Sequence, residues 1–319
     1  MLCSFAEQFP TFTEDFLERG RTLRRRFREE TVTDLMMGCL ITAGLGRIIV
    51  EFPDEPATGA DMEWNFVDQG RGTFFRIVLQ AKQAYGDGGS WTRHNYRELL
   101  HRSGTGGKLQ AETLCDTARV PGSATYPLYV LYHPAQTCRL ARQDGETMLA
   151  GVNLADGFII EQLVKSAATQ KLRTNNKSLR VIAPHLFSLS DLFCPSVLLP
   201  APPFAPGISG ELWRGAMERI RDGRLGVPIP PTPQDVRKRL AGALTALPKN
   251  AVGMPDHPRQ PVPDVAVEIP ADVQNVIHRA RDGKKSEPRV SLDRWRVTYL
   301  SGSPRDDEGY LRRDPDSQY

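Results

Sequence analysis

The sequence predicts an α/β fold of the α+β kind, in which a central mixed sheet is flanked by helices. Two observations predict it. Before residue 195 the expected elements follow in the order helix, three strands, two helices, strand and helix. The composition is that of a globular protein, with 40% hydrophobic and 25% charged residues among 319.

Proline divides the chain into two parts. Seven of the 25 prolines precede residue 195, and the other eighteen lie from Pro195 onward. A step of this kind marks a compact body followed by a looser extension. We therefore expect a domain over residues 1–200. A proline-rich extension over residues 201–319 is expected to contain short helices and a disordered C-terminal tail.

The N-terminal region is expected to be helical over residues 11–45, where Phe12 and Phe16 recur at helical spacing. Within it, Glu29 and Glu30 lead into an apolar run. Taken alone, each acid is most simply a solvated charge beside nearby arginines, or an acid favoured by a helix N-terminus. A one-residue difference in helix phase exchanges the two acids, so either can face the body.

A β-hairpin is the most informative part of the chain. Strands are expected over residues 47–52, 60–67 and 73–82. The turn Asp68-Gln69-Gly70-Arg71-Gly72 joins the last two, and its residues tolerate turn conformations. Side chains alternate along a strand, so Asp61 shares a face with Glu63, and Gln80 shares a face with Lys82. Pairing of the two strands places the acids beside the amide and the lysine.

Two interpretations of Lys82 are open. It can balance Asp61 at an exposed edge of the sheet, or it can be a buried cation with a function. The segment Arg76–Leu79, apolar except for its arginine, indicates a central strand and favours the second interpretation. A buried charge is costly unless it is paired or used.

The remaining elements are simpler. Helices are expected over residues 91–101, 108–118 and 155–168, a strand over 126–132, and short packed pieces over 179–183 and 186–195. In the extension, helices are expected over residues 211–222, 233–247 and 271–282, with Thr232 as an N-cap. Basic patches at residues 237–239 and 279–285 fit solvated helix faces slightly better than a surface for nucleic acid or a protein partner.

Composition excludes several classes of protein. The five cysteines form no CxxC pair and are odd in number, which argues against a zinc cluster or a disulfide framework and fits a reducing cytoplasm. We see no signal peptide and no apolar run long enough to span a bilayer, so we expect a cytoplasmic protein without a membrane partner. The net charge of +3 means that any nucleic-acid site depends on local clusters of basic residues.

One group of side chains has the composition of a catalytic site. Its members are Glu30, Asp61, Glu63, Gln80 and Lys82. Carboxylates and an amide oxygen suit a hard cation such as Mg²⁺ or Mn²⁺. Such an ion polarises a phosphoryl oxygen and activates water, and a lysine beside it stabilises the charge that develops on phosphate. This combination predicts metal-assisted hydrolysis of a phosphodiester.

The order of these residues resembles the PD-(D/E)XK nuclease superfamily, and Gln80-Ala81-Lys82 is similar to the QxK variant of Mrr-type restriction endonucleases. The chain also resembles an uncharacterised family of bacterial proteins, over about residues 25–135 and toward Pro195. The matching segments are Glu30-Thr31-Val32-Thr33-Asp34, Gly59-Ala60-Asp61-Met62-Glu63-Trp64, Gln80-Ala81-Lys82 and Pro127-Leu128-Tyr129-Val130-Leu131-Tyr132. The resemblance implies a restriction-endonuclease-like core.

By this resemblance Asp61, Gln80 and Glu30 hold the metal, and Lys82 acts on the attacking water. The leading hypothesis is a Mg²⁺-dependent endonuclease acting on DNA, with a role in bacterial defence by analogy. The alternative is a non-catalytic module that keeps the fold and binds nucleic acid or protein. A homodimer, and a protein partner bound through the C-terminal extension, are left open.

Overall fold

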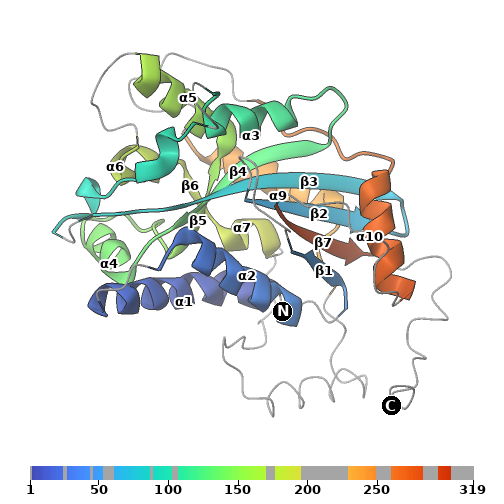
Figure 1. Ribbon diagram of the computed structural model, residues 1–319, viewed down its shortest axis with the longest axis horizontal. Helices are drawn as coiled ribbons and strands as arrows, with labels where there is room; N and C mark the ends of the chain where they lie inside the picture. The colour runs from blue at the N-terminus through green and yellow to red at the C-terminus, as the bar shows by residue number, and fades with distance from the viewer. Residues whose placement is uncertain are drawn as a thin grey trace, which may run out of the picture.

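The computed structural model describes ten segments of the chain, which are residues 2–23, 27–43, 46–52, 61–86, 89–102, 107–169, 177–194, 229–248, 260–282 and 294–302. Within them, helices flank a single mixed sheet, which confirms the predicted α/β fold class (Figure 1). Gly59 and Ala60 of the hairpin motif, the helix expected over 211–222 and the tail from 303 onward lie outside the described residues.

The sheet has seven strands in the order β1-β7-β2-β3-β4-β5-β6. The strands are β1 (Ile48–Glu51), β2 (Met62–Asp68), β3 (Thr73–Gln83), β4 (Thr125–Tyr132), β5 (Val152–Asp156), β6 (Leu186–Ser188) and β7 (Trp295–Ser301). The β2–β7 and β3–β4 pairs are parallel, and the other neighbours are antiparallel. The sequence did not predict β5, β6 or β7.

The expected hairpin is confirmed as β2 and β3. They pair antiparallel with Met62 opposite Leu79, and Gly72 closes the turn with a φ of 68°. That left-handed conformation favours glycine. Because β3 lies between β2 and β4, Lys82 is on a central strand and not at an exposed edge.

The C-terminal region contributes to the same sheet. Strand β7 lies between β1 and β2, so the red strand β7 runs beside the blue strand β1 (Figure 1). It brings Val297 opposite Trp64 of β2 and Val50 of β1. The division expected at residue 200 therefore does not divide the sheet.

Helices cover both faces of the sheet. The α-helices are α1 (Leu2–Thr22), α2 (Glu29–Ala43), α3 (Gln110–Ala118), α4 (Ala135–Gln143), α5 (Gly157–Thr169), α6 (Leu179–Ile182), α7 (Leu189–Phe193), α9 (Pro233–Ala246) and α10 (Ala271–Asp282). The 3-10 helices are η1 (Trp91–Arg93), η2 (Arg97–Leu100) and η3 (Ala183–His185). The region over 91–101 thus forms two short 3-10 turns instead of the one expected helix.

Each face of the sheet has its own apolar core. One core takes buried side chains from α1, α2, α7 and α9, such as Phe9, Met36 and Leu240. The other takes them from α3, α4, α5 and α6, such as Leu114 and Ile160. Burial on both faces explains why β2 and β4 are buried along their whole length.

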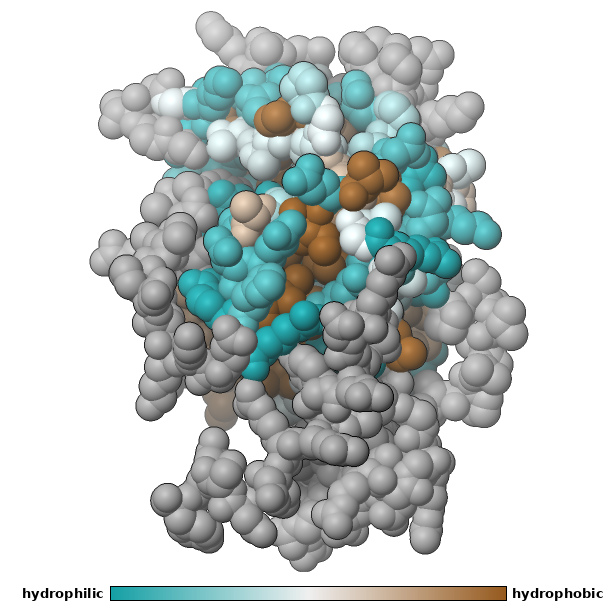
Figure 2. Space-filling model, turned by 90° about the vertical axis from the view of Figure 1, so that its right-hand side faces the viewer, coloured by the Kyte–Doolittle hydropathy of each residue, from teal (hydrophilic) through white to brown (hydrophobic). Residues whose placement is uncertain are grey.

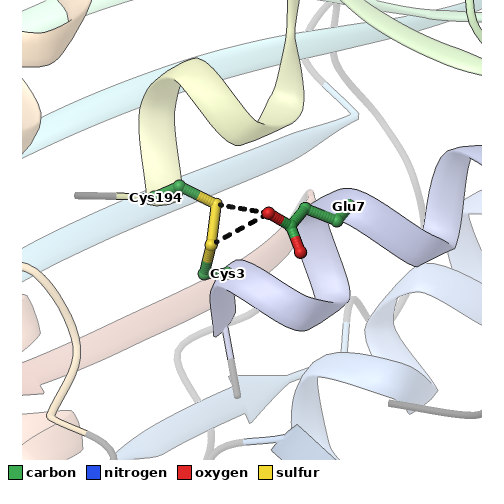
Figure 3. Close-up of side chains that lie close together, drawn as sticks. All are labelled: Cys3, Glu7 and Cys194. Atoms are coloured by element: carbon green, nitrogen blue, oxygen red, sulfur yellow. Dashed lines mark hydrogen bonds between the residues drawn. A yellow bond between two sulfur atoms is a disulfide. The ribbon is translucent and has the colours of Figure 1, made fainter. Parts of the chain in front are cut away.

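A disulfide joins Cys3 of α1 to Cys194, the residue after α7 (Figure 3). The expectation from cysteine spacing is therefore wrong for this pair. The two residues are 191 positions apart, and the packing of α1 against α7 brings their Cα atoms to 4.6 Å. The Glu7 carboxylate lies 3.6 Å from the Cys3 sulfur, but a disulfide leaves neither sulfur free to act as a thiolate ligand.

The end of the molecule that carries α10 exposes a strip of apolar surface between hydrophilic ridges (Figure 2). A hollow of about 480 Å³ is lined by the β2–β3 turn and α10, including Arg71 and Gln274. Strand β3 runs eleven residues from this turn to Gln83, so the hollow lies at the far end of β3 from Lys82. Among the described helices, none has the length and hydropathy needed to cross a bilayer.

Candidate active site

Asp61 is fixed at the start of the hairpin by three hydrogen bonds. Its backbone N–H donates to Leu79 O at 2.9 Å, which extends the β2–β3 ladder by one residue. Its backbone oxygen accepts from Trp295 N at 3.1 Å. Its Oδ2 accepts from Ala81 N at 2.7 Å. The carboxylate therefore reaches across to the backbone of the QxK segment.

Lys82 extends from β3 to the first residue of α2. Its Nζ lies 3.2 Å from Glu29 Oε1, and the two side chains are 5% and 17% exposed. Glu29 is also positioned by its backbone, because its oxygen accepts from the Thr33 hydroxyl at 3.0 Å. That hydroxyl lies 3.1 Å from the Tyr132 hydroxyl of β4, which ties the helix start to the sheet.

The group of Asp61, Glu29 and Lys82, called the Lys82 site below, has more negative than positive charge. Burial raises the pKa of Glu29 to about 7, although Lys82 acts in the opposite direction. Burial also raises the pKa of Asp61, despite Lys82 and the Ala81 N–H. Each carboxylate therefore lies in an environment that one lysine does not fully compensate.

Glu30 lies at the exposed margin of the Lys82 site. The structure turns Glu29 toward Lys82, whereas Glu30 is exposed, although its charge raises the pKa of Asp61. Glu29 was the alternative in the sequence interpretation, one position away in helix phase.

Glu98, a residue that the sequence analysis missed, is a further acid near this site. It lies in η2, and its charge raises the pKa of both Asp61 and Glu29. No local pattern marks it, because it comes to the site from a separate 3-10 turn.

Gln80 is fully buried next to the Lys82 site. Its Oε1 accepts from the Tyr129 hydroxyl at 3.1 Å, and its Nε2 donates to Gln110 Oε1 at 2.7 Å. Burial raises the pKa of Tyr129, and the charge of Asp61 contributes to that rise. Asp61 and Gln80 thus share Tyr129 as a neighbour. The hydrogen bond from Gln80 to Gln110 of α3 fixes the amide so that its oxygen faces Tyr129.

Glu63 is not brought to Lys82. The register places it opposite Val78, four residues before Lys82 on β3. Its Oε1 accepts from Arg296 Nε at 2.9 Å and from Asn65 Nδ2 at 2.8 Å, and it lies 3.6 Å from Arg76 Nε. Glu63 therefore belongs to a separate ion network.

That network, called the Arg296 cluster below, joins four strands to α10. Its members are Glu51, Glu63, Asp272, Arg76, Arg279 and Arg296. Three acids meet three arginines in it. Burial raises the pKa of Glu51 even here, with Arg296 and Arg279 acting in the opposite direction.

The chemistry of the donor atoms at the Lys82 site fits a hard divalent cation. Mg²⁺ is commonly held by one or two carboxylates and several waters. Asp61 and Glu29 supply carboxylates that one lysine does not fully compensate. The amide oxygen of Gln80 lies 3.1 Å from the Tyr129 hydroxyl, whose pKa the charge of Asp61 helps to raise. Among the described residues, the acids of this site do not form a set of three with ligand atoms within 4.8 Å of one another. An ion held here would therefore keep much of its water.

Comparison with known protein families identifies one family that matches the chain. A family model described as "Family of unknown function (DUF6615)" matches residues 2–306. The chain belongs to this family. The DUF6615 match runs through β7, so the family includes the C-terminal strand as well as the hairpin. No curated protein and no solved structure matches the chain.

Proposed function

We propose that the protein is a metal-dependent nuclease that hydrolyses phosphodiester bonds, with DNA as the favoured substrate. The observation that carries the proposal is the almost fully buried Lys82, held by Glu29 and close enough to Asp61 to affect its pKa. One carboxylate would suffice to pair a structural lysine. The second leaves buried negative charge, which favours a site that takes up another cation.

Each residue of the Lys82 site has a separate role in the proposed reaction. When bound, Mg²⁺ or Mn²⁺ supplies Lewis-acid activation of the phosphate, and Asp61 with the oxygen of Gln80 would hold it. Lys82 orients the attacking water and stabilises the charge that develops on phosphate. Glu29 has a pKa of about 7 and is suited to accept the proton of that water near neutral pH.

The bonds change in one displacement. The water oxygen bonds to phosphorus as its proton passes to Glu29. The bond from phosphorus to the leaving oxygen breaks at the same centre, and that oxygen takes a proton from solvent. The order of a helix acid, a strand aspartate and a QxK strand supports this reaction, since it is the order on which the nuclease resemblance rests.

The test is cleavage of plasmid and of single-stranded circular DNA with Mg²⁺, with Mn²⁺ or with EDTA. We expect metal-dependent cleavage by the natural protein and a rate about 100- to 1,000-fold lower for Asp61→Asn and Lys82→Met. The matched control is Lys108→Met, because the Lys108 side chain is 71% exposed and its ion pair is with Asp116 of α3. Its rate should equal that of the natural protein.

Two results would contradict the nuclease. One is full activity in folded Asp61→Asn and Lys82→Met, verified by thermal melting. The other is salt-sensitive binding of DNA by the natural protein without cleavage under any metal condition. The second result would favour the non-catalytic binding module.

A further inference from the structure

A cavity adjoins the Lys82 site and has no role in the reaction described above. Its volume is about 270 Å³. Gln83 and Ala84 of its wall directly follow Lys82, and Phe27 stands two residues before Glu29. Arg97 of its wall directly precedes Glu98. The wall therefore continues from three of the segments that build the Lys82 site.

The lining combines flat rings with cations. Tyr85, Phe27 and His94 contribute rings, and Arg21 and Arg97 contribute guanidinium groups. The Arg97 guanidinium lies over the Tyr85 ring, 5.5 Å from its centroid. Rings that stack on bases, together with arginines that pair with phosphate, are the usual means of binding an unpaired nucleotide.

The rings are held in place by their neighbours. Phe27 stacks on Phe16 of α1, with centroids 4.2 Å apart. His94 Nδ1 lies 3.0 Å from Ser90 O, and its ring packs so closely on Gly86 that an added Cβ would come within 2.6 Å of it. The cavity is therefore a preformed site, which lowers the cost of ordering a ligand.

We propose that this cavity binds one unstacked nucleotide of a single-stranded segment next to the scissile phosphate. Its volume lies just below the roughly 300–1,000 Å³ of drug-sized pockets, so it suits one nucleotide and excludes a base pair. Arg21 and Arg97 take the phosphate, and the Tyr85 ring takes the base. The position beside a scissile phosphate rests on the proposed nuclease function, whereas the binding of an unpaired nucleotide does not.

The test measures binding without cleavage. The natural full-length protein, kept in EDTA, is titrated into a single-stranded oligonucleotide that carries 2-aminopurine, into its blunt duplex, and into a free mononucleotide. We expect a fluorescence change and tight binding only for the single strand. Tyr85→Ala and Arg97→Ala should each weaken that binding about five- to 150-fold. The control is Arg71→Ala in the β2–β3 turn, which should bind the single strand as the natural protein does.

Three results would overturn the proposal. They are equal affinity for the duplex, equal affinity for the free mononucleotide, or unchanged single-strand affinity in both folded variants. Gly86→Ala gives an independent readout, because the displaced His94 ring should reduce the 2-aminopurine signal.

The two proposals fail separately. Binding as expected with no metal-dependent cleavage would contradict the nuclease alone. Cleavage with normal single-strand binding in Tyr85→Ala and Arg97→Ala would contradict the nucleotide pocket alone.

Discussion

Asp61 and Glu63 stand two residues apart in the chain, yet they enter charge clusters of opposite character. Glu63 lies in the Arg296 cluster, where three acids meet three arginines. Asp61 lies in the Lys82 site, where two half-buried acids share one buried lysine. The first cluster has as many arginines as acids, whereas the second has two acids for one lysine.

The comparison shows that burial of charge does not by itself indicate function. Each cluster contains a nearly buried charge, Glu63 in one and Lys82 in the other, and both of these residues lie on the β2–β3 hairpin. The difference is that arginines from β3, β7 and α10 supply a partner for each acid of the Arg296 cluster. A balanced cluster holds elements in register, whereas an unbalanced one favours ligand binding.

The largest expected effect comes from breaking the balanced cluster. Arg296→Met removes the guanidinium that lies 2.9 Å from Glu63 and 3.1 Å from Asp272. Breaking a buried pair leaves an uncompensated charge, so the free energy of unfolding should fall by about 3–5 kcal/mol in urea titrations. Arg139→Met, at an exposed position of α4, serves as the control and should change it by less than about 0.5 kcal/mol. Equal losses would show that the Arg296 cluster does not stabilise the sheet.

The next effect is a pH dependence confined to the Lys82 site. Because the pKa of Glu29 is raised from 4.5 to about 7 in the folded protein, folding favours its protonated form. This stabilisation is complete below about pH 4.5 and is lost as the pH rises through 7, on the order of 3 kcal/mol. Glu29→Gln should therefore flatten the fall in stability between pH 5 and 8, measured by urea midpoints in EDTA.

Asp61 acts in the same direction, so a smaller slope should remain in Glu29→Gln. A slope that persists in full in Glu29→Gln would show that Glu29 does not titrate in this range.

A divalent cation should have a smaller effect on the free energy of unfolding, and this effect should depend on the Lys82 site and not on the Arg296 cluster. At pH 8, Mg²⁺ at ten times its dissociation constant should stabilise the natural protein by about 1.4 kcal/mol, because only the folded state binds it. Thermal melts with increasing Mg²⁺ should show this rise for the natural protein and for Glu63→Gln, but not for Asp61→Asn. The same rise in Asp61→Asn would place the ion elsewhere.

The smallest expected effect on stability is that of Glu30→Gln, which is compared with Glu29→Gln in the same helix. Glu30 is exposed, so Glu30→Gln should change the free energy of unfolding by less than about 0.5 kcal/mol and leave the pH slope in place. Glu29→Gln, one residue earlier, should remove most of that slope. The reverse pattern in paired urea titrations would assign the helix carboxylate to Glu30.

Local patterns in the sequence predicted much of the fold. The hairpin followed from alternation and from a glycine turn, and α9 followed from a proline after Thr232, whose side chain caps the helix. Strand β7 was missed because Trp295–Ser301 follows a long polar and proline-rich stretch, and its partners lie more than 200 residues earlier. The Cys3–Cys194 pair was missed for the same reason of distance in the chain.

The sequence by itself determined that Asp61 lies beside the strand that carries Gln80 and Lys82, because strand periodicity and a short turn act over a few residues. Only the tertiary structure decided which acids join them. In the folded chain, α2 is oriented so that Glu29 and not Glu30 contacts Lys82. Glu63 pairs instead with Arg296 of β7, in the other cluster. These choices depend on packing between distant segments, which a local pattern does not specify.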